Sequence, residues 1–240
     1  MLTATNNVRL FALMLLHATL GQAQAGLPRE LGPVGIFEID EQGLVLFVDS
    51  SACDPKNNWR SEGILLSSNR GKSWQVMLTR INGSVFDYVS QPRNGKIWIV
   101  GHSFVEGPDH DPFMLVPKLT GEGWEKHTIY SGYAELQSVS FLDNGDLVAC
   151  IRHLRLGATG WSGSLFAHQS PDNGRTWRQI GRASKCPASP GVVFTPIHKN
   201  TAHWRVVDKG STGFEVQENS NDGQGWRTVS NFPDQDCEPY

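Results

Sequence analysis

Two tryptophans lie in long polar segments of this sequence, where their rings could hold a ligand. Trp59 and Arg60 belong to one of these segments, and His153 and Trp161 belong to another. An exposed tryptophan is costly, and its ring often stacks on a sugar or on a partner's side chain. Packing against the body of the protein is the competing interpretation. We therefore take these four residues as candidate ligand-binding residues.

A third polar segment contains His102, Asp109, His110 and Asp111, whose side chains can bind metal ions. All four lie close together in one segment and lack the spacing of a Cys-x-x-Cys or His-Glu-x-x-His motif. We therefore expect a solvated loop without a metal, and we expect no cofactor. The sequence also lacks a Gly-x-Ser-x-Gly elbow and a glycine-rich phosphate loop, because its glycines fall mainly at turns.

The elements that position these segments come from a repeated motif. Residues 170–177 (Ser-Pro-Asp-Asn-Gly-Arg-Thr-Trp) closely match residues 67–74 and more loosely match residues 219–226, while residues 121–124 keep only Gly-Glu-Gly-Trp. The four tryptophans, Trp74, Trp124, Trp177 and Trp226, are 50, 53 and 49 residues apart. A period of this length indicates a repeat protein.

Each repeat also carries a turn followed by a short apolar run, in phase with its tryptophan. The turns are Gln42-Gly43, Asn94-Gly95, Asn144-Gly145 and Lys199-Asn200. β-Branched and aromatic residues bounded by such turns favour hairpins, and no sustained helical period is present. In the third repeat we expect strands over residues 139–142, 147–151, 164–168 and 177–180. The sequence therefore predicts an all-β fold in which each repeat forms four antiparallel strands.

The Ser-x-Asp-x-Gly-x-Thr-Trp motif resembles the Asp-box of the bacterial neuraminidase repeat (BNR), and the chain resembles the sialidase superfamily over most of residues 34–229. This resemblance implies a β-propeller of about four four-stranded blades. The Ser and Asp side chains of the box would hydrogen-bond the turn between the third and fourth strands, with the Trp packed beneath. The box is expected to be structural, and the variable loops would gather on one face.

The resemblance also implies a site around Glu135 and Arg152. A sialidase arginine clamps the carboxylate of sialic acid through its guanidinium fork. A glutamate polarises a tyrosine nucleophile, for which Tyr133 or Tyr130 is the candidate. Asp49 is the candidate acid/base, with Asp54 as an alternative. The simpler interpretation is that Arg152 ends a strand and pairs with Glu135 for structural reasons.

Two functions of different classes follow. One is a noncatalytic propeller that binds a glycan or an extracytoplasmic protein through its loop face, and the other is a glycoside hydrolase of the sialidase type. A sialidase propeller has six blades, whereas this chain carries four repeats. A split propeller completed by a second chain is a third possibility, although four blades can close on their own, and we expect a monomer.

The first 25 residues have the pattern of a secretory signal. Arg9 precedes an apolar run, and Ala23-Gln24-Ala25 forms a small-residue cleavage site. We therefore expect a secreted or periplasmic protein whose folded domain comprises residues 26–240. The formal net charge of −3 disfavours nucleic acid and anionic membranes as partners.

Four cysteines remain after residue 25: Cys53, Cys150, Cys186 and Cys237. In an oxidising compartment an even number fits two disulfides, with three possible connectivities. A Cys186–Cys237 bond is the pairing that we favour, because it would fix the C-terminal tail. Unpaired buried thiols are the alternative.

Overall fold

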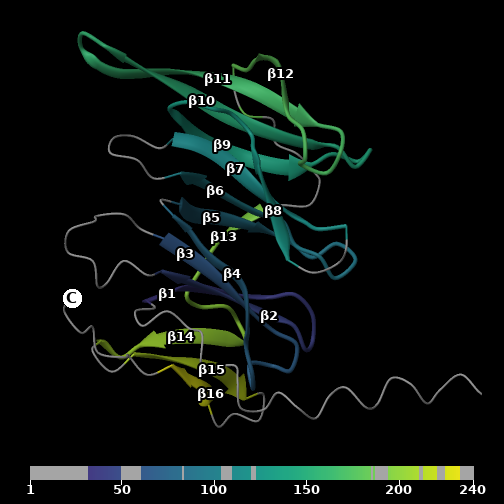
Figure 1. Cartoon of the computed structure of the whole chain (residues 1–240), viewed down its shortest axis with the longest axis vertical. Coiled ribbons are helices and arrows are strands. Elements are labelled where there is room, and N and C mark those ends of the chain that lie inside the picture. Colours follow the sequence, from purple (N-terminus) through teal and green to yellow (C-terminus); the bar gives the residue numbers. More distant parts are fainter. Residues whose placement is uncertain are drawn as a thin grey trace, which may run out of the picture.

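The computed structural model describes residues 32–49, 61–82, 84–103, 110–119, 123–184, 186, 194–210, 213–220 and 225–232 (Figure 1). These residues form β-strands joined by turns, and no α-helix occurs among them. The expectation of an all-β protein is confirmed. The strands form four antiparallel groups, three of four strands and one of three.

The first two groups lie in one extended sheet. Group 1 consists of β1 (Gly32–Glu38), β2 (Leu44–Asp49), β3 (Ser61–Ser67) and β4 (Gln75–Asn82). Group 2 consists of β5 (Ser84–Ser90), β6 (Ile99–Ser103), β7 (His110–Pro117) and β8 (Trp124–Thr128). A single parallel pair, Ser61 with Ser84, joins the two groups. The other pairs within each group are antiparallel, so the hairpin pattern of the repeats is present.

The other two groups are separate sheets. Group 3 consists of β9 (Ala134–Phe141), β10 (Leu147–Gly157), β11 (Gly160–Ser170) and β12 (Arg178–Arg182). Group 4 consists of β14 (Trp204–Asp208), β15 (Phe214–Ser220) and β16 (Gly225–Phe232). The short β13 (Phe194–Pro196) precedes group 4 in the chain but pairs with β5. Group 4 therefore has one strand fewer than the others.

Three apolar cores stack the groups in the order 4, 1, 2, 3 (Figure 1). Leu46 and Val216 lie in the core between groups 1 and 4, Phe47 and Phe113 in the core between groups 1 and 2, and Ala149 in the core between groups 2 and 3. Groups 3 and 4 lie at opposite ends of the stack in Figure 1, and no core of the described residues joins them. Burial of these alternating apolar faces holds the stack together.

The chain must pass groups 2 and 1 on its way from group 3 to group 4. It first forms β13 against β5, and the carbonyl of His198 then accepts a hydrogen bond of 3.0 Å from the amide of Ile36 in β1. The carbonyl of Lys199 accepts another from Val206 in β14. A Cβ on Gly35 would lie 2.5 Å from Ile197 Cγ2, so the absence of a side chain at Gly35 permits this close approach.

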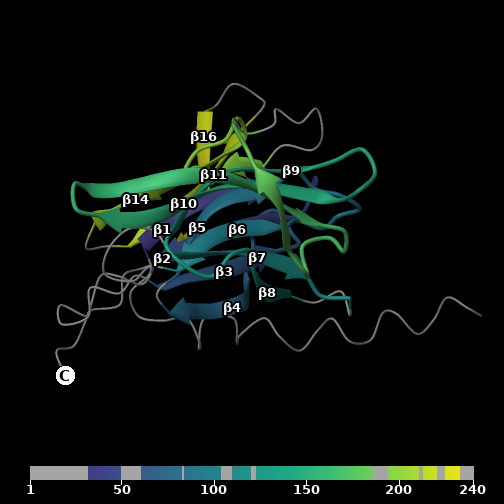
Figure 2. The ribbon, with the colours of Figure 1, turned by 90° about the horizontal axis from the view of Figure 1, so that it is seen from above.

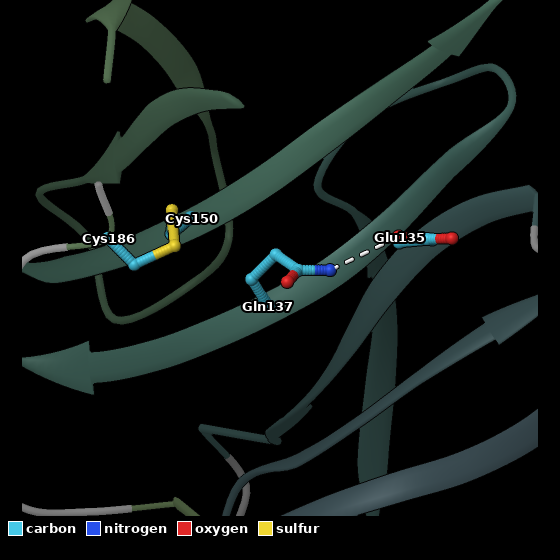
Figure 3. Close-up of a disulfide and its surroundings, with 4 residues drawn as sticks. All are labelled: Glu135, Gln137, Cys150 and Cys186. Atoms are coloured by element: carbon cyan, nitrogen blue, oxygen red, sulfur yellow. Dashed lines mark hydrogen bonds between the residues drawn. A yellow bond between two sulfur atoms is a disulfide. The ribbon is translucent and has the colours of Figure 1, made fainter. Parts of the chain in front are cut away.

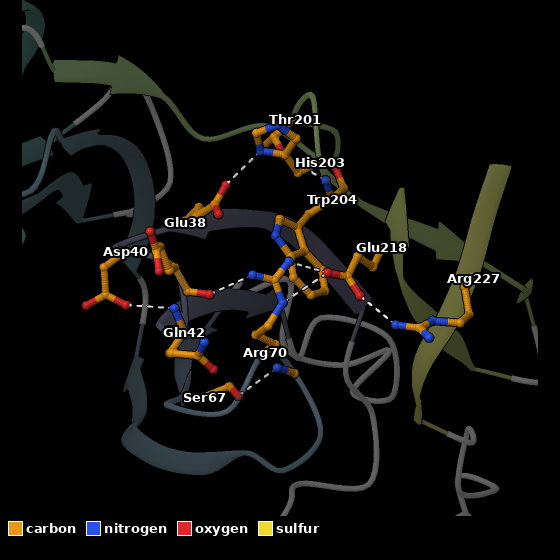
Figure 4. A network of polar contacts seen from close by, with 12 residues as sticks. Glu38, Asp40, Gln42, Ser67, Arg70, Thr201, His203, Trp204, Glu218 and Arg227 are labelled. Carbon is orange, nitrogen blue, oxygen red and sulfur yellow. Dashed lines mark hydrogen bonds and ion pairs between the residues drawn. The ribbon is translucent and has the colours of Figure 1, made fainter. Parts of the chain in front are cut away.

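A charged network reinforces the contact between groups 1 and 4 (Figure 4). Arg70, in a turn of group 1, pairs with Glu218 of β15, and its Nη1 donates to the carbonyl of Glu41 over 2.7 Å. Arg227 pairs with the same carboxylate at 2.9 Å. Burial would raise the pKa of Glu218, but the bonds from Arg70 and Arg227 outweigh it and lower that pKa. The network links two groups that are distant in sequence.

The Asp-box turn of group 3 has the hydrogen bonds that the sequence predicts. Ser170 Oγ accepts from the amide of Gly174 over 2.7 Å, and Asp172 Oδ1 accepts from the amide of Thr176 over 2.8 Å. Gly174 has a φ of 94°, and Trp177 Nε1 donates to its carbonyl over 2.9 Å. Burial would raise the pKa of Asp172, but bonds from Thr176, Ser170 and Arg175 lower it to about 2. The turn is therefore fixed by its own side chains.

Three of the four repeat tryptophans pack at interfaces between groups. Trp74 belongs to the core between groups 1 and 4, Trp124 packs against the core between groups 1 and 2, and Trp177 packs against that between groups 2 and 3. Trp226 lies instead on the outer face of group 4, where the Arg205 guanidinium stacks over its ring at 4.5 Å. The repeat is therefore equivalent at three positions and modified at the end of the stack.

The outer face of group 4 is polar. Arg205 Nε donates to Gln217 Oε1 over 2.8 Å, and Gln217 Nε2 donates to Glu215 Oε2 over 2.7 Å. Thr228 Oγ1 donates to the same carboxylate over 3.0 Å, and Lys209 pairs with it at 3.5 Å. A polar outer face is what the terminal unit of a repeat stack requires to meet water.

Candidate functional site

Glu135 and Arg152 lie directly opposite each other on β9 and β10. Arg152 Nη1 lies 3.3 Å from Glu135 Oε2, and their side chains are 44% and 38% exposed. Gln137 Nε2 donates to the same Oε2 over 3.3 Å (Figure 3). Because Ile151 faces the core between groups 2 and 3, Arg152 projects from the opposite, outer face of group 3. The structure thus brings the two predicted residues together.

Residues 152–163 are paired strands rather than the loop expected from the sequence. Strands β10 and β11 continue in register to Gly157 and Gly160, and only Ala158 and Thr159 form the turn. This hairpin extends beyond the rest of its group (Figures 1 and 2). Arg152 therefore lies within a strand and not at its end.

Gly163 provides the space that the Arg152 side chain occupies. A Cβ built on Gly163 would lie 2.5 Å from Arg152 Cγ and 2.8 Å from Arg152 Cδ. Gly163 lies opposite Leu154, two positions before the Leu165 that pairs with Arg152. The arginine stem thus lies over Gly163, on the side of the hairpin that leads to Trp161. The sequence reasoning missed this glycine, because its role depends on the strand register.

Tyr133 and Trp161 form an exposed aromatic pair on the same outer face. Their ring centroids are 5.1 Å apart, and their residues are 39% and 43% exposed. The rings of His110 and Tyr133 meet in a T-shaped contact with centroids 4.8 Å apart, and the carbonyl of Tyr133 accepts from the amide of Leu154 over 2.8 Å. We refer to Tyr133, Glu135, Arg152 and Trp161 as the platform.

The platform lacks the hydrogen bond that a tyrosine nucleophile would need. Both contacts of the Glu135 carboxylate are to Arg152 and Gln137. Within the described part of the chain, no hydrogen bond joins Glu135 to Tyr133. The observed contacts suit a surface that pairs aromatic rings with a donor and an acceptor.

His153 lies on the opposite face of β10 from Arg152. Its ring stacks on Tyr130 at 3.8 Å and on Phe166 at 4.3 Å, and its Nε2 lies 3.0 Å from His168 Nε2. Burial lowers the pKa of His153, and nearby Arg155 lowers it further. Burial and then His153 lower the pKa of His168 to about 4. The structure thus separates His153 and Tyr130 from the platform.

Asp49 is the last residue of β2 and pairs with Gly32 and Glu62. Its side chain, and the candidates Asp54, Trp59 and Arg60, lie outside the described residues. Strand β2 belongs to group 1, and group 2 lies between it and the platform (Figure 1).

In the polar segment around His102, two described histidines each lie beside an aspartate. His102 Nδ1 lies 2.8 Å from Asp87 Oδ2, and His110 Nδ1 lies 2.9 Å from Asp111 Oδ1. Asp109 lies outside the described residues. Over the described ranges, no three His, Cys, Asp or Glu side chains are arranged to hold a metal ion.

A disulfide joins Cys150 to Cys186 (Figure 3), which corrects the expected Cys186–Cys237 bond. Cys150 lies on the outer face of β10, so the bond holds Cys186 against that face. Cys53 and Cys237 lie outside the described residues, as does the proposed signal segment 1–25.

No protein-family model matches this chain, and no curated protein matches it. Among the residues that the structure describes, no helix is long and apolar enough to cross a membrane. The functional argument therefore depends on the platform.

Proposed function

We propose that this protein is a secreted or periplasmic glycan-binding module of sialidase-like, BNR-repeat architecture, and that the platform is its binding surface. Its strand groups would be blades of a propeller-type repeat. The Asp-box turns and the equivalent positions of three repeat tryptophans support this repeat. The polar outer face of group 4 supports a monomer, because completion of a ring by a second chain would require a more apolar face.

The observation that carries the proposal is the exposed Trp161–Tyr133 pair beside the exposed Glu135–Arg152 pair. Sugars present apolar C–H faces and rows of hydroxyl groups. Aromatic rings stack on the former, and charged side chains exchange hydrogen bonds with the latter. Arg152 and Trp161 belong to the β10–β11 hairpin, and Glu135 and Tyr133 belong to the neighbouring segment that pairs with β10. Paired backbone thus holds all four residues, so little ordering would be required on binding.

The hydrolase alternative depends on Glu135 polarising a tyrosine. Glu135 instead contacts Arg152 and Gln137, and Tyr133 packs against rings. Binding is therefore the function that the geometry favours. Turnover of a fluorogenic sialoside that is lost in Arg152→Ala would favour the hydrolase instead.

The test is binding of the mature chain to a glycan array, with Trp161→Ala as the variant. We expect binding to fall by about tenfold or more, as for an aromatic residue at the centre of a contact surface. Trp226→Ala is the matched control, because Trp226 lies on the outer face of group 4. If the native chain and Trp161→Ala are both folded and bind the glycans equally well, the platform is not the binding surface.

A further inference from the structure

We infer that the ligand of the platform is a neutral sugar that presents two adjacent hydroxyl groups beside an apolar face. This inference rests on the proposed glycan-binding function and specifies its ligand. It differs from the carboxylated sugar that the resemblance to sialidases implies. The argument depends on the charge of the platform, its free hydrogen-bonding atoms and its shape.

The first step is charge. Arg152 is already paired with Glu135 at 3.3 Å, so the platform has no net formal charge. The strand register places three uncharged residues on the same face: Leu154, Gly163 and Leu165. A sugar carboxylate that approached Arg152 would also approach the Glu135 carboxylate. Repulsion between like charges would then offset the attraction to the guanidinium.

The second step is the set of hydrogen-bonding atoms. Arg152 and Gln137 both donate to Glu135 Oε2, so Oε1 has no protein donor among the described residues. Arg152 uses only Nη1 in this pair, which leaves its Nε and Nη2 as donors. One hydroxyl of a diol can donate to Glu135 Oε1 while its neighbour accepts from Arg152. A carboxylate has no hydrogen to donate to Oε1.

The third step is shape. The Arg152 stem lies over Gly163 of β11, and its guanidinium reaches Glu135 of β9, so the side chain lies along the surface of the sheet. Trp161 is exposed and contacts Tyr133. Tyr133 lies two residues before Glu135, so the aromatic pair neighbours the ion pair on the same face. A sugar ring that stacks on Trp161 would thus have hydroxyl groups on one edge near Arg152 and Glu135.

The test compares neutral and carboxylated probes by titration of the mature chain with lactose, cellobiose, sialyllactose and glucuronic acid. We expect the native chain to prefer a neutral disaccharide. In Glu135→Gln the arginine loses its compensating charge. Affinity for the carboxylated probes should then rise by roughly threefold to fivefold, the size expected of one exposed charge pair. Glu125→Gln, an exposed glutamate on β8, is the matched control and should leave both affinities unchanged.

The outcomes separate this inference from the proposed function. Preference of the native chain for the carboxylated probes, lost in Arg152→Ala, would overturn the neutral-sugar inference and leave glycan binding in place. Absence of a rise in Glu135→Gln would also overturn it. If no glycan of either class binds, the proposed function fails and the inference fails with it. Thermal melting of every variant shows whether it is folded.

Discussion

Replacement of Asp172 by Asn tests the Asp-box turn of group 3. Asp172 accepts hydrogen bonds from the amides of Arg175 and Thr176 and from the hydroxyls of Ser170 and Thr176. In the related turn of group 1, Asn69 already occupies this position. Its Oδ1 accepts from the Ser73 amide over 2.9 Å. The Asp172→Asn variant should therefore keep the shape of the turn and lose only its charge.

The magnitude follows from the pKa of Asp172, which falls from 3.8 to about 2 on folding. A shift of nearly two units corresponds to at most about 2.5 kcal/mol of stability. Asp172 is partly exposed, so solvent screening reduces the expected contribution to about 1 kcal/mol. Because the folded pKa is depressed, this contribution is complete above about pH 4. It disappears as the pH falls toward about 2.

The assay is urea unfolding followed by tryptophan fluorescence, at neutral pH and in steps down to about pH 2.5. The free energy of unfolding of the native protein should exceed that of Asp172→Asn by about 1 kcal/mol at neutral pH, and this difference should shrink progressively toward pH 2.5. Asp172→Ala should lower the free energy of unfolding more than Asp172→Asn does, because the turn amides lose their acceptor. The converse change, Asn69→Asp, should raise the free energy of unfolding at neutral pH, and this gain should be lost in acid. If the difference between native protein and Asp172→Asn is independent of pH, the assigned role of the charge is refuted.

Three other changes test the fold. Reduction of the Cys150–Cys186 disulfide should lower the free energy of unfolding by about 2–4 kcal/mol, which melting with and without reductant measures. A peptide map without this crosslink would contradict the pairing. Gly35→Ala should lower the free energy of unfolding by about 1–3 kcal/mol from overpacking, because its Cβ would lie 2.8 Å from the His198 carbonyl oxygen. The same free energy of unfolding in denaturant for the variant and the native protein would contradict this. In an NMR titration His168 should stay neutral until about pH 4. Because its folded pKa lies below its unfolded value, stability should fall as the pH drops from about 6.5 toward 4, and less so in His168→Phe.

The sequence alone determined the local structure of the repeats. Asn144-Gly145 and the Ser170–Trp177 box predicted turns where turns occur, because side chains and glycines control these bends within a few residues. The short apolar run from Leu147 to Ile151 also predicted a strand where a strand occurs. The pairing of Glu135 with Arg152 was expected from the resemblance to sialidases, although the predicted strands began at residue 139 and ended at residue 151, so that neither residue was placed in a strand.

Only the tertiary structure decided how the groups are arranged and which chemistry they expose. The order 4, 1, 2, 3 depends on residues 194–200 pairing with β5 and β1, a long-range contact that no local pattern specifies. The length of the β10–β11 hairpin placed Arg152 over Gly163 and set Trp161 beside Tyr133. The Cys150–Cys186 bond likewise joins residues that are 36 positions apart in the sequence. These features depend on register and packing between segments distant in sequence, and local residue types do not determine such contacts.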